Sequence, residues 1–321
     1  MGVTDPNAFT GALLDRADDS RRRDPEWLAG QRAHPAARAI VAGSRGLRVQ
    51  GTSLARVPLD GAPADLLLGM DAEGPLFAVD EDPAGEGVPP LIGAGGNRGE
   101  PPAGTGGERI GLRQAAMVLS QEDGGLAAYT AALLNWHRRH RFCANCGHPT
   151  DVAEAGLVRS CPTCGAEHHP RTDPVVIMLV TDGDERLLLG RQAAWPTGRY
   201  SALAGFVSPG ESLEEAVARE VREETGVAVG RPVYVASQPW PFPASLMLGF
   251  SAPWAGGEPD VADDELQDAR WFAREEIAAA AAEDDDAGWG TPGDAGGRLK
   301  LPPRLAIARR LVEHWLLPTT G

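Results

Sequence analysis

The sequence has little positive charge for its size, few cysteines and no long hydrophobic run. It carries 30 lysines and arginines against 45 aspartates and glutamates, which gives a formal net charge of -15 over 321 residues. This balance argues against a protein that coats nucleic acid or binds anionic membranes, because both need a basic surface. An acidic protein that handles an acidic substrate needs positive charge supplied locally, as a divalent metal ion does.

No uninterrupted apolar stretch of the sequence approaches the roughly 20 residues that a membrane-spanning helix requires. The N-terminus has no basic segment followed by an apolar one, so we expect neither export nor contact with a membrane. The expected location is the cytoplasm. In that reducing compartment the four cysteines are expected to be metal ligands rather than disulfides.

The cysteines form two knuckles, each with the pattern Cys-x-x-Cys-Gly. Four thiolates in this arrangement predict a closed tetrahedral zinc ribbon, which is structural because no coordination position is left for water. Two disulfides or an iron centre are the alternatives. The predicted ligands are Cys143, Cys146, Cys161 and Cys164. Nearby histidines are expected on the surface or in packing rather than as ligands, namely His137, His140, His148, His168 and His169.

A second set of candidate ligands lies on one expected helix. The run from Ser212 to Glu215 is a capping box, so the helix should begin at Ser212, and Gly226 stands where a left-handed residue ends it. At about 100° per residue, the apolar residues of this helix form one inward stripe. The stripe contains Leu213, Ala216, Val217 and Val221, together with Glu220 and Glu224, while Glu223 lies at its margin.

Three carboxylates on an apolar side, close to the negative end of a helix dipole, require a cation. Mg²⁺ or Mn²⁺ fits, because hard divalent ions take carboxylate oxygens and bridge to phosphates. One glutamate could then remove the proton of a metal-activated water, which makes Glu220, Glu223 and Glu224 the candidate catalytic residues. The alternative is a salt-bridged surface helix that uses Arg219 and Arg222, which this projection points away from the stripe.

A proline-rich tract follows the helix, with the sequence Ser-Gln-Pro-Trp-Pro-Phe-Pro-Ala-Ser from Ser237 to Ser245. Prolines stiffen the backbone, so Trp240 and Phe242 lose little entropy when they form a wall for flat rings. A role in the core alone is the alternative, although alternating prolines fit poorly in an interior strand.

Taken together, these motifs resemble the Nudix hydrolases, and within them the NADH pyrophosphatase branch. The run from Gly205 to Val227 fills every constrained position of the Nudix box, and the proline-rich tract matches the signature of the branch. The resemblance covers about residues 141–316. It implies a Nudix α/β/α sandwich with a mixed sheet, in the α/β (α+β) class.

We expect three parts in the chain. Residues 1–140 are an N-terminal α+β domain of unclear role, for which a degenerate Nudix-like fold is one interpretation. Residues 141–172 are the zinc ribbon, and residues 173–321 are the catalytic Nudix domain with a C-terminal helix. Expected helices span 35–42, 124–141, 212–225 and 303–316, and expected strands span 173–180, 185–190, 233–236 and 246–252. A surface loop is expected at 81–108, and a fraying helix end and linker at 278–297.

The resemblance also implies roles for single residues. Metal binding is implied for the Ala204 carbonyl, Glu220, Glu223, Glu224 and Glu265. Phe206 would stack on adenine. The tract would hold the dinucleotide through Gln238, Pro239, Trp240, Pro241, Phe242, Pro243, Ala244 and Ser245, with Met247 and Ala308 nearby. Structural roles in the box are implied for Gly205, Glu211, Arg219 and Gly226.

Two positions depart from the family pattern. Ser208 stands where the family usually has Glu, and His169 stands where a Tyr usually helps to sandwich the adenine. The first lies outside the constrained positions of the box. The second could weaken adenine binding or change the preference between the free dinucleotide and a longer substrate, so His169 stays among the candidate substrate-binding residues.

The expected activity is Mg²⁺- or Mn²⁺-dependent hydrolysis of the pyrophosphate of NAD(H), which yields nicotinamide mononucleotide and AMP. The resemblance also implies removal of NAD caps from RNA and a homodimer. One alternative is a Nudix hydrolase for ADP-ribose or dinucleoside polyphosphates. The other is a non-catalytic zinc-ribbon protein that senses a nucleotide or binds nucleic acid.

Overall fold

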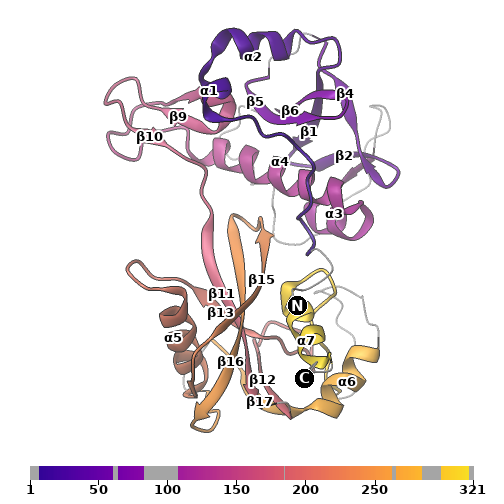
Figure 1. Cartoon of the computed structure of the whole chain (residues 1–321), viewed down its shortest axis with the longest axis vertical. Coiled ribbons are helices and arrows are strands. Elements are labelled where there is room, and N and C mark those ends of the chain that lie inside the picture. Colours follow the sequence, from indigo (N-terminus) through magenta and orange to yellow (C-terminus); the bar gives the residue numbers. More distant parts are fainter. Residues whose placement is uncertain are drawn as a thin grey trace. The chain divides into compact units, whose positions relative to one another are not determined.

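The chain forms two compact units in a computed structural model that describes residues 7–60, 64–82, 108–183, 185–261, 265–283 and 298–317. The first unit contains residues 173–238, the residues from 245 onward, and Asn7. The second contains residues 8–172 and residues 239–244 of the proline-rich tract. Each unit has its own mixed β-sheet (Figure 1).

The first unit is a sheet of seven strands with helices on both faces. Five of its strands follow the order β14-β16-β11-β12-β17. Off this path, β13 pairs with β11 and β15 pairs with β16. The pair β11 and β16 is parallel, whereas β12 and β13 pair antiparallel with β11. The strands are β11 (Asp173–Asp182), β12 (Arg186–Arg191), β13 (Leu203–Phe206), β14 (Ala228–Val229), β15 (Val233–Trp240), β16 (Ser245–Gly256) and β17 (Asp268–Ala273). The helices are α5 (Leu213–Thr225), α6 (Arg274–Ala282) and α7 (Ile307–Leu316).

Strand β11 shows why this sheet is covered on both sides. Successive residues of a strand point to opposite faces, and both faces of β11 are apolar. One cluster joins Val176, Met178 and Val180 to Ala216, Val217 and Val221 of α5, and the other joins Ile177 and Leu179 to Ile307, Leu311 and Val312 of α7. Figure 1 shows α5 on one side of the sheet and α6 and α7 on the other. The predicted α/β/α sandwich is confirmed.

The second unit contains another mixed sheet and the cysteine-rich segment. Its sheet has the order β3-β2-β1-β6-β5, with β4 pairing with β1 and β7 with β2, and β1 is parallel to β6. The strands are β1 (Arg38–Gly43), β2 (Gly46–Gln50), β3 (Ser53–Leu54), β4 (Arg56–Pro58), β5 (Leu66–Asp71), β6 (Gly74–Asp80) and β7 (Glu108–Ile110). The helices are α1 (Asp19–Arg23), α2 (Pro25–Arg32), α3 (Leu112–Val118) and α4 (Gln121–Arg139). A separate sheet contains β8 (Asp151–Ala153), β9 (Val158–Ser160) and β10 (Glu167–His168), with the short helix η1 (Glu154–Gly156) between the first two.

The helix expected at 35–42 is wrong, because most of that segment is strand β1. The alanines there favour a helix by intrinsic propensity. However, Ala39, Ile40, Val41 and Ala42 are all buried, and β1 pairs with strands on both of its edges. Burial on both faces and pairing on both edges outweigh propensity at such a position.

The remaining elements follow the predictions with shifted ends. The helix expected at 124–141 is α4, and the last helix begins at Ile307 rather than Pro303. Strands β15 and β16 are longer than expected. Most of the loop predicted at 81–108 and of the linker predicted at 278–297 lies outside the described residues. None of the helices in the described ranges combines the length and apolar character that a bilayer crossing needs.

Candidate active site and metal centres

Helix α5 begins and ends where its motif predicts. The Ser212 hydroxyl accepts a hydrogen bond from the backbone of Glu215 at 3.2 Å, and the Glu215 carboxylate accepts one from the backbone of Ser212 at 2.8 Å. At the other end, Gly226 adopts a left-handed φ of 71°. These two ends set the rotational phase of the helix. The carboxylates near its C-terminus are therefore presented on a fixed face.

Glu224 is the most buried of these carboxylates, with 6% of its surface exposed. Burial raises the pKa of Glu224 to about 8, and the charges of Glu265 and Glu220 act in the same direction, against a backbone hydrogen bond from Ala204. Its Oε2 atom is buried and has no hydrogen-bond partner. An unpartnered oxygen on a buried carboxylate provides a ligand atom that a cation would satisfy.

Glu220 and Glu265 complete this acidic group. Burial raises the pKa of Glu220, with Arg219 opposing the shift and the charges of Glu223 and Glu265 adding to it. The charge of Glu265 therefore acts on both Glu220 and Glu224, although Glu265 lies far from α5 in sequence. The tertiary structure therefore places Glu265 within electrostatic range of both α5 carboxylates, and Glu265, like Glu223, is exposed.

Arg219 is the cation that already lies among these carboxylates. Its guanidinium donates to Glu211 at 2.5 and 2.8 Å and to the carbonyl oxygen of Phe206 at 2.9 Å, which ties α5 to the loop after β13. It also donates to Glu220 and to Glu223, both at 2.8 Å. The projection that points Arg219 away from the carboxylates is wrong for its side chain, because a long flexible stem reaches beyond its backbone position.

Gly205 allows the backbone of β13 to approach the acidic group closely. A Cβ atom at this position would lie 1.9 Å from the Cδ atom of Glu220, so any side chain here would displace the Glu220 carboxylate. The neighbouring Ala204 donates its backbone N–H to the Glu224 carboxylate. The carboxylates of Glu220, Glu224 and Glu265 offer oxygen atoms of the kind that a hard divalent cation prefers, and the Ala204 carbonyl stays a predicted further ligand.

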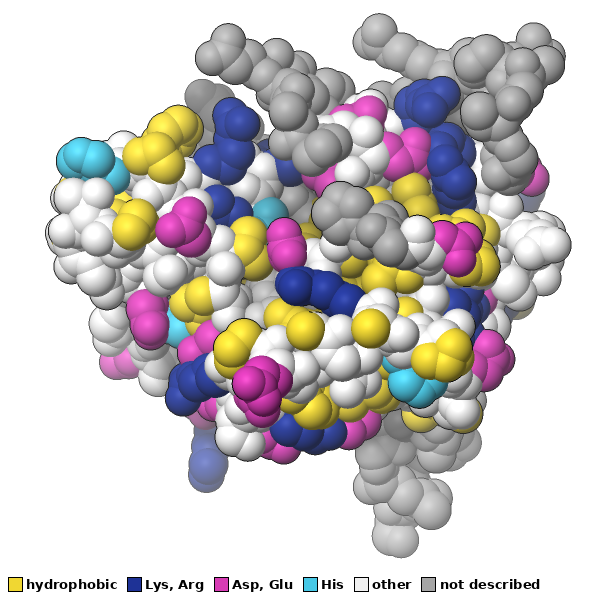
Figure 2. Space-filling model, turned by 90° about the horizontal axis from the view of Figure 1, so that it is seen from above, with side chains coloured by type: hydrophobic (Ala, Val, Ile, Leu, Met, Phe, Trp, Pro, Cys, Tyr) yellow, Lys and Arg dark blue, Asp and Glu magenta, His cyan; other side chains and the backbone are white. Residues whose placement is uncertain are grey.

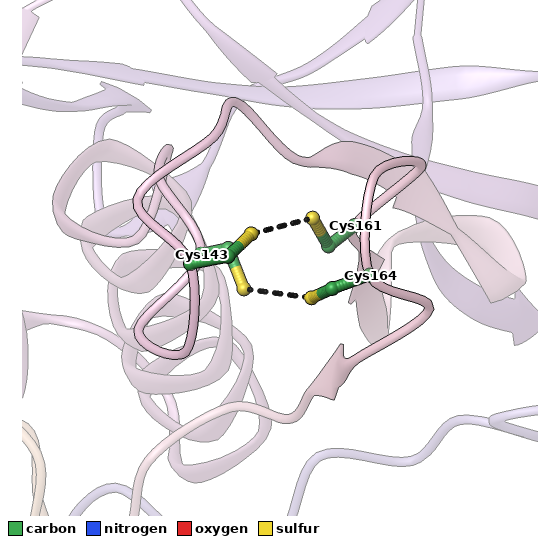
Figure 3. Close-up of side chains that lie close together, drawn as sticks. Cys143, Cys161 and Cys164 are labelled. Atoms are coloured by element: carbon green, nitrogen blue, oxygen red, sulfur yellow. Dashed lines mark hydrogen bonds between the residues drawn. The ribbon is translucent and has the colours of Figure 1, made fainter.

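The four cysteine sulfurs all lie within 4.8 Å of one another. The Cys143 and Cys164 sulfurs are 3.6 Å apart, and those of Cys146 and Cys161 are 3.5 Å apart. Figure 3 shows Cys161 and Cys164 pointing from one loop toward the loop that carries Cys143. All four thiols are free, so the disulfide alternative fails in this structure. The predicted structural zinc fits this closed set of four soft ligands.

Several N–H groups surround the cysteine sulfurs. The backbone and side-chain nitrogens of Asn145 donate to Cys143 at 3.4 Å and to Cys164 at 3.7 Å. A backbone hydrogen bond from Ala166 is the main cause that lowers the pKa of Cys164 to about 6. His168, which we expected on the surface or in packing, places its Nε2 atom 3.3 Å from the sulfur of Cys143. His168 therefore contacts a ligand of the centre, a role that cysteine spacing alone does not reveal.

The aromatic residues of the proline-rich tract belong to a cluster in the second unit. The ring centroids of Trp240 and Phe242 are 5.1 Å apart, and Phe9 packs edge-on at 6.2 and 5.9 Å from them. The guanidinium of Arg113 lies 4.4 Å from the centre of the Phe242 ring. Nothing in the sequence pattern points to Phe9 or Arg113, because both are remote from the tract along the chain.

The structure places the other predicted substrate-binding residues in different surroundings. Gln238 is buried, and its side chain donates to the Leu305 carbonyl at 2.8 Å and accepts from the Ile307 backbone at 2.8 Å. These bonds tie the tract to the start of α7, which also contains the buried Ala308. Met247 is partly buried against the same core. Phe206 is 60% exposed, so its ring is accessible for stacking.

The two departures from the family pattern both lie at exposed positions. Ser208 is exposed, and its backbone N–H donates to Glu211 at 2.9 Å. This contact does not depend on the side chain at position 208. His169 is exposed at the end of the cysteine-rich segment.

Three family models match consecutive parts of the chain. Residues 26–136 match a model described as "NADH pyrophosphatase-like rudimentary NUDIX domain". Residues 138–168 match "NADH pyrophosphatase zinc ribbon domain", and residues 171–290 match "NUDIX domain". The cysteine set and the helix of carboxylates each lie within the corresponding match.

Several curated relatives are described as NAD-capped RNA hydrolases. The chain is 46% identical over 212 residues to "NAD-capped RNA hydrolase NudC" of Mycobacterium bovis, a match that spans 65% of each chain. It is 44% identical over 211 residues to the protein of that name from Stutzerimonas stutzeri, which covers 66% of this chain and 68% of the relative. Among solved structures, a NUDIX hydrolase from Nitrosomonas europaea is 24% identical and covers 42% of this chain and 78% of its own, with a TM-score of 0.36.

Proposed function

We propose that this chain, which belongs to the NADH pyrophosphatase branch of the Nudix hydrolase family, hydrolyses the central pyrophosphate of NAD(H) to nicotinamide mononucleotide and AMP. One observation carries the proposal: Glu224 is buried beside Glu220 and Glu265 with an unpartnered carboxylate oxygen. Such a group destabilises the fold in the absence of a cation. Carboxyl groups with strongly shifted pKa values concentrate at sites of binding or catalysis.

The residues around Glu224 have different roles in the proposed reaction. A divalent cation held by Glu220, Glu224, Glu265 and the Ala204 carbonyl would offset charge on the pyrophosphate and make a bound water more acidic. A carboxylate of the α5 group removes the proton of the attacking water, a step worth roughly 10²–10⁴ in rate. Arg219 holds Glu220 and Glu223 on the helix and ties it to the β13 loop.

The proposed substrate range includes NAD-capped RNA. The name shared by the relatives supports this range, because it describes removal of an NAD cap. The chemistry at the pyrophosphate is the same in both substrates. Figure 2 shows Lys and Arg side chains interspersed with Asp and Glu on the face it presents, rather than gathered into one basic area. This mixed face, together with the acidic total charge, favours recognition of the dinucleotide over extensive binding of an RNA backbone.

In the first unit, Phe206 of β13 is exposed and offers its ring to the adenine. In the second unit, Trp240 and Phe242 of the tract pack against each other and are the residues to which the family resemblance assigns the dinucleotide. Aromatic faces provide sequence-tolerant stacking for nucleobases. We further propose a homodimer in the cytoplasm, where four free thiols remain reduced and available to zinc.

The test is product release from three substrates by the full chain with Mg²⁺ or Mn²⁺. NADH, NAD and an NAD-capped RNA oligonucleotide are incubated separately, and nicotinamide mononucleotide is quantified by chromatography. We expect release from NADH and NAD with a metal ion and none without it. Intact dinucleotides after incubation with either metal would refute the proposed activity, and turnover of the RNA alone would restrict it to decapping.

A further inference from the structure

Two of the proposed metal ligands do not lie on α5 and must be held in place by other means. The Ala204 carbonyl belongs to β13, and Glu265 lies just before β17. Tyr200 precedes Ala204 by four residues, and Asp268 follows Glu265 by three. Any contact between Tyr200 and Asp268 therefore links the two segments that carry these ligands.

Such a contact exists and includes a third residue. Tyr200 is 3% exposed, and its hydroxyl donates a hydrogen bond to the carboxylate of Asp268. Arg270 donates from Nη2 to the Tyr200 oxygen at 2.6 Å, and its Nε atom lies 3.4 Å from the Asp268 carboxylate. The guanidinium of Arg270 also lies 4.9 Å from the centre of the Tyr200 ring. These contacts join the three side chains through two hydrogen bonds and one ion pair.

Both segments are also fixed to the end of β12. Ser201, next to Tyr200, exchanges backbone hydrogen bonds with Gly190 at 2.9 and 3.0 Å. Gln267 donates its backbone N–H to the Arg191 carbonyl at 2.8 Å. Leu266 is buried against Gly190, where an added Cβ atom would lie 2.9 Å from the leucine side chain. Glu265, at the start of this segment, is exposed, and its charge acts on Glu224 of α5.

An anchor of this kind matters for Glu265 because this exposed residue lies in a segment remote from α5. The like charges of Glu265, Glu220 and Glu224 repel one another in the absence of a cation, so the fold must hold the segment of Glu265 near α5. Residues that lie behind a metal ligand and fix its orientation commonly change metal affinity by 10–100-fold when replaced.

We propose that Tyr200, Asp268 and Arg270 form a positioning group that sets the distance between Glu265 and the Ala204 backbone for binding of a divalent cation. The three residues act through the segments that they join, so they are positioning residues rather than catalytic ones. The inference rests on the proposed function for the identity of the ligands. It adds the means by which two of them, from different parts of the chain, are held as a pair.

The experiment measures Mn²⁺ binding to the zinc-containing full chain without substrate, from the electron paramagnetic resonance signal of free Mn²⁺. The variants are Tyr200→Phe, which keeps the ring and removes the hydroxyl, and Arg270→Gln, which changes a largely exposed side chain. Tyr234→Phe is the matched control, because this tyrosine is 54% exposed on β15 and has no contact with Asp268. We expect the first two to weaken Mn²⁺ binding by roughly 10-fold and the control to leave it unchanged.

Mn²⁺ affinities of Tyr200→Phe and Arg270→Gln equal to that of Tyr234→Phe would overturn the inference. If Tyr200→Phe does not fold, as judged by circular dichroism, Arg270→Gln decides alone. A wild-type chain that binds no Mn²⁺ also overturns it. A wild-type chain that binds Mn²⁺ but leaves NADH intact contradicts the proposed activity and leaves the positioning group standing, so the two failures are distinguishable.

Discussion

The cysteine centre and the glutamate site differ in where their metal ligands lie along the chain. The four cysteine ligands come from two short knuckles, and their sulfurs already lie within 4.8 Å of one another. The proposed ligands of the glutamate site come from α5, β13 and the segment before β17, and Arg219 donates hydrogen bonds to Glu220 and Glu223. One centre is local in sequence, whereas the other is proposed to draw its ligands from distant segments.

The difference reflects what each metal does. A structural zinc site contributes folding energy, so ligands that are close in sequence and fully enclosed serve it best. A site that activates water must keep an open position and a reactive carboxylate, which costs stability in the absence of the metal. We therefore expect substitutions in the first site to unfold the ribbon, and substitutions in the second to stop the reaction without harming the fold.

The largest effect is expected from Cys161→Ser. Loss of one thiolate opens the zinc site, and zinc binding is worth on the order of 10 kcal/mol in small zinc-dependent domains. Native mass spectrometry should show a single zinc on the wild-type chain and none on the variant, with a lower unfolding temperature. Thr163→Ala, an exposed change in the same knuckle, should keep the zinc. A wild-type preparation that is free of zinc and fully active would refute the ribbon.

Glu224→Gln should lower the activity and raise the stability of the metal-free protein. The amide keeps the shape but removes a carboxylate that we propose as a metal ligand and as a candidate proton acceptor, so turnover of NADH should fall by at least roughly 10²-fold. The metal-free protein should become more stable, because a desolvated carboxyl with a pKa of about 8 is removed. Steady-state kinetics and thermal unfolding measure the two effects. Glu214→Gln, exposed on the same helix, is the control, and normal turnover by Glu224→Gln would contradict its essential role.

The pH dependence of stability separates the two centres further. The folded pKa of Glu224 is raised from 4.5 to about 8, so between these values the folded state keeps a proton that the unfolded chain has lost. Stability without magnesium or manganese should therefore fall as the pH rises from about 4.5 to about 8, by up to about 5 kcal/mol. Urea unfolding across this pH range should show that the free energy of unfolding of the wild type falls with pH, and that it falls less steeply for Glu224→Gln. Equal slopes would contradict the assignment to Glu224.

The smallest effect is expected from His168→Phe. Removing the ring nitrogen that lies 3.3 Å from the Cys143 sulfur leaves all four thiolates in place. Zinc should then be released to a chromophoric chelator roughly 10-fold faster, because groups that hydrogen-bond to metal ligands tune the affinity of the site. His148→Phe, another histidine of the ribbon, is the matched control. Equal release rates for the two variants would assign His168 to packing alone.

Local patterns predicted the parts of the molecule that depend on neighbours in sequence. The limits of α5 follow from its capping box and Gly226, and the cysteine spacing predicted a centre that the structure confirms. Segment 35–42 was mispredicted because its alanines suit a helix, whereas pairing on both edges of β1 decides the outcome. The side chain of Arg219 was misplaced because a helical projection follows the backbone position and not the reach of a long side chain.

The amino-acid order by itself determined the four thiolates of the ribbon and the inward face of α5, because each depends on a cap or a fixed spacing, and the α/β/α architecture followed only from the resemblance of its motifs to a known family. Only the tertiary structure decided that Glu265 acts on Glu220 and Glu224, that Tyr200 meets Asp268, and that His168 contacts Cys143. These contacts join segments whose separation along the chain carries no periodic signal. Sheet pairing and core packing alone bring them together.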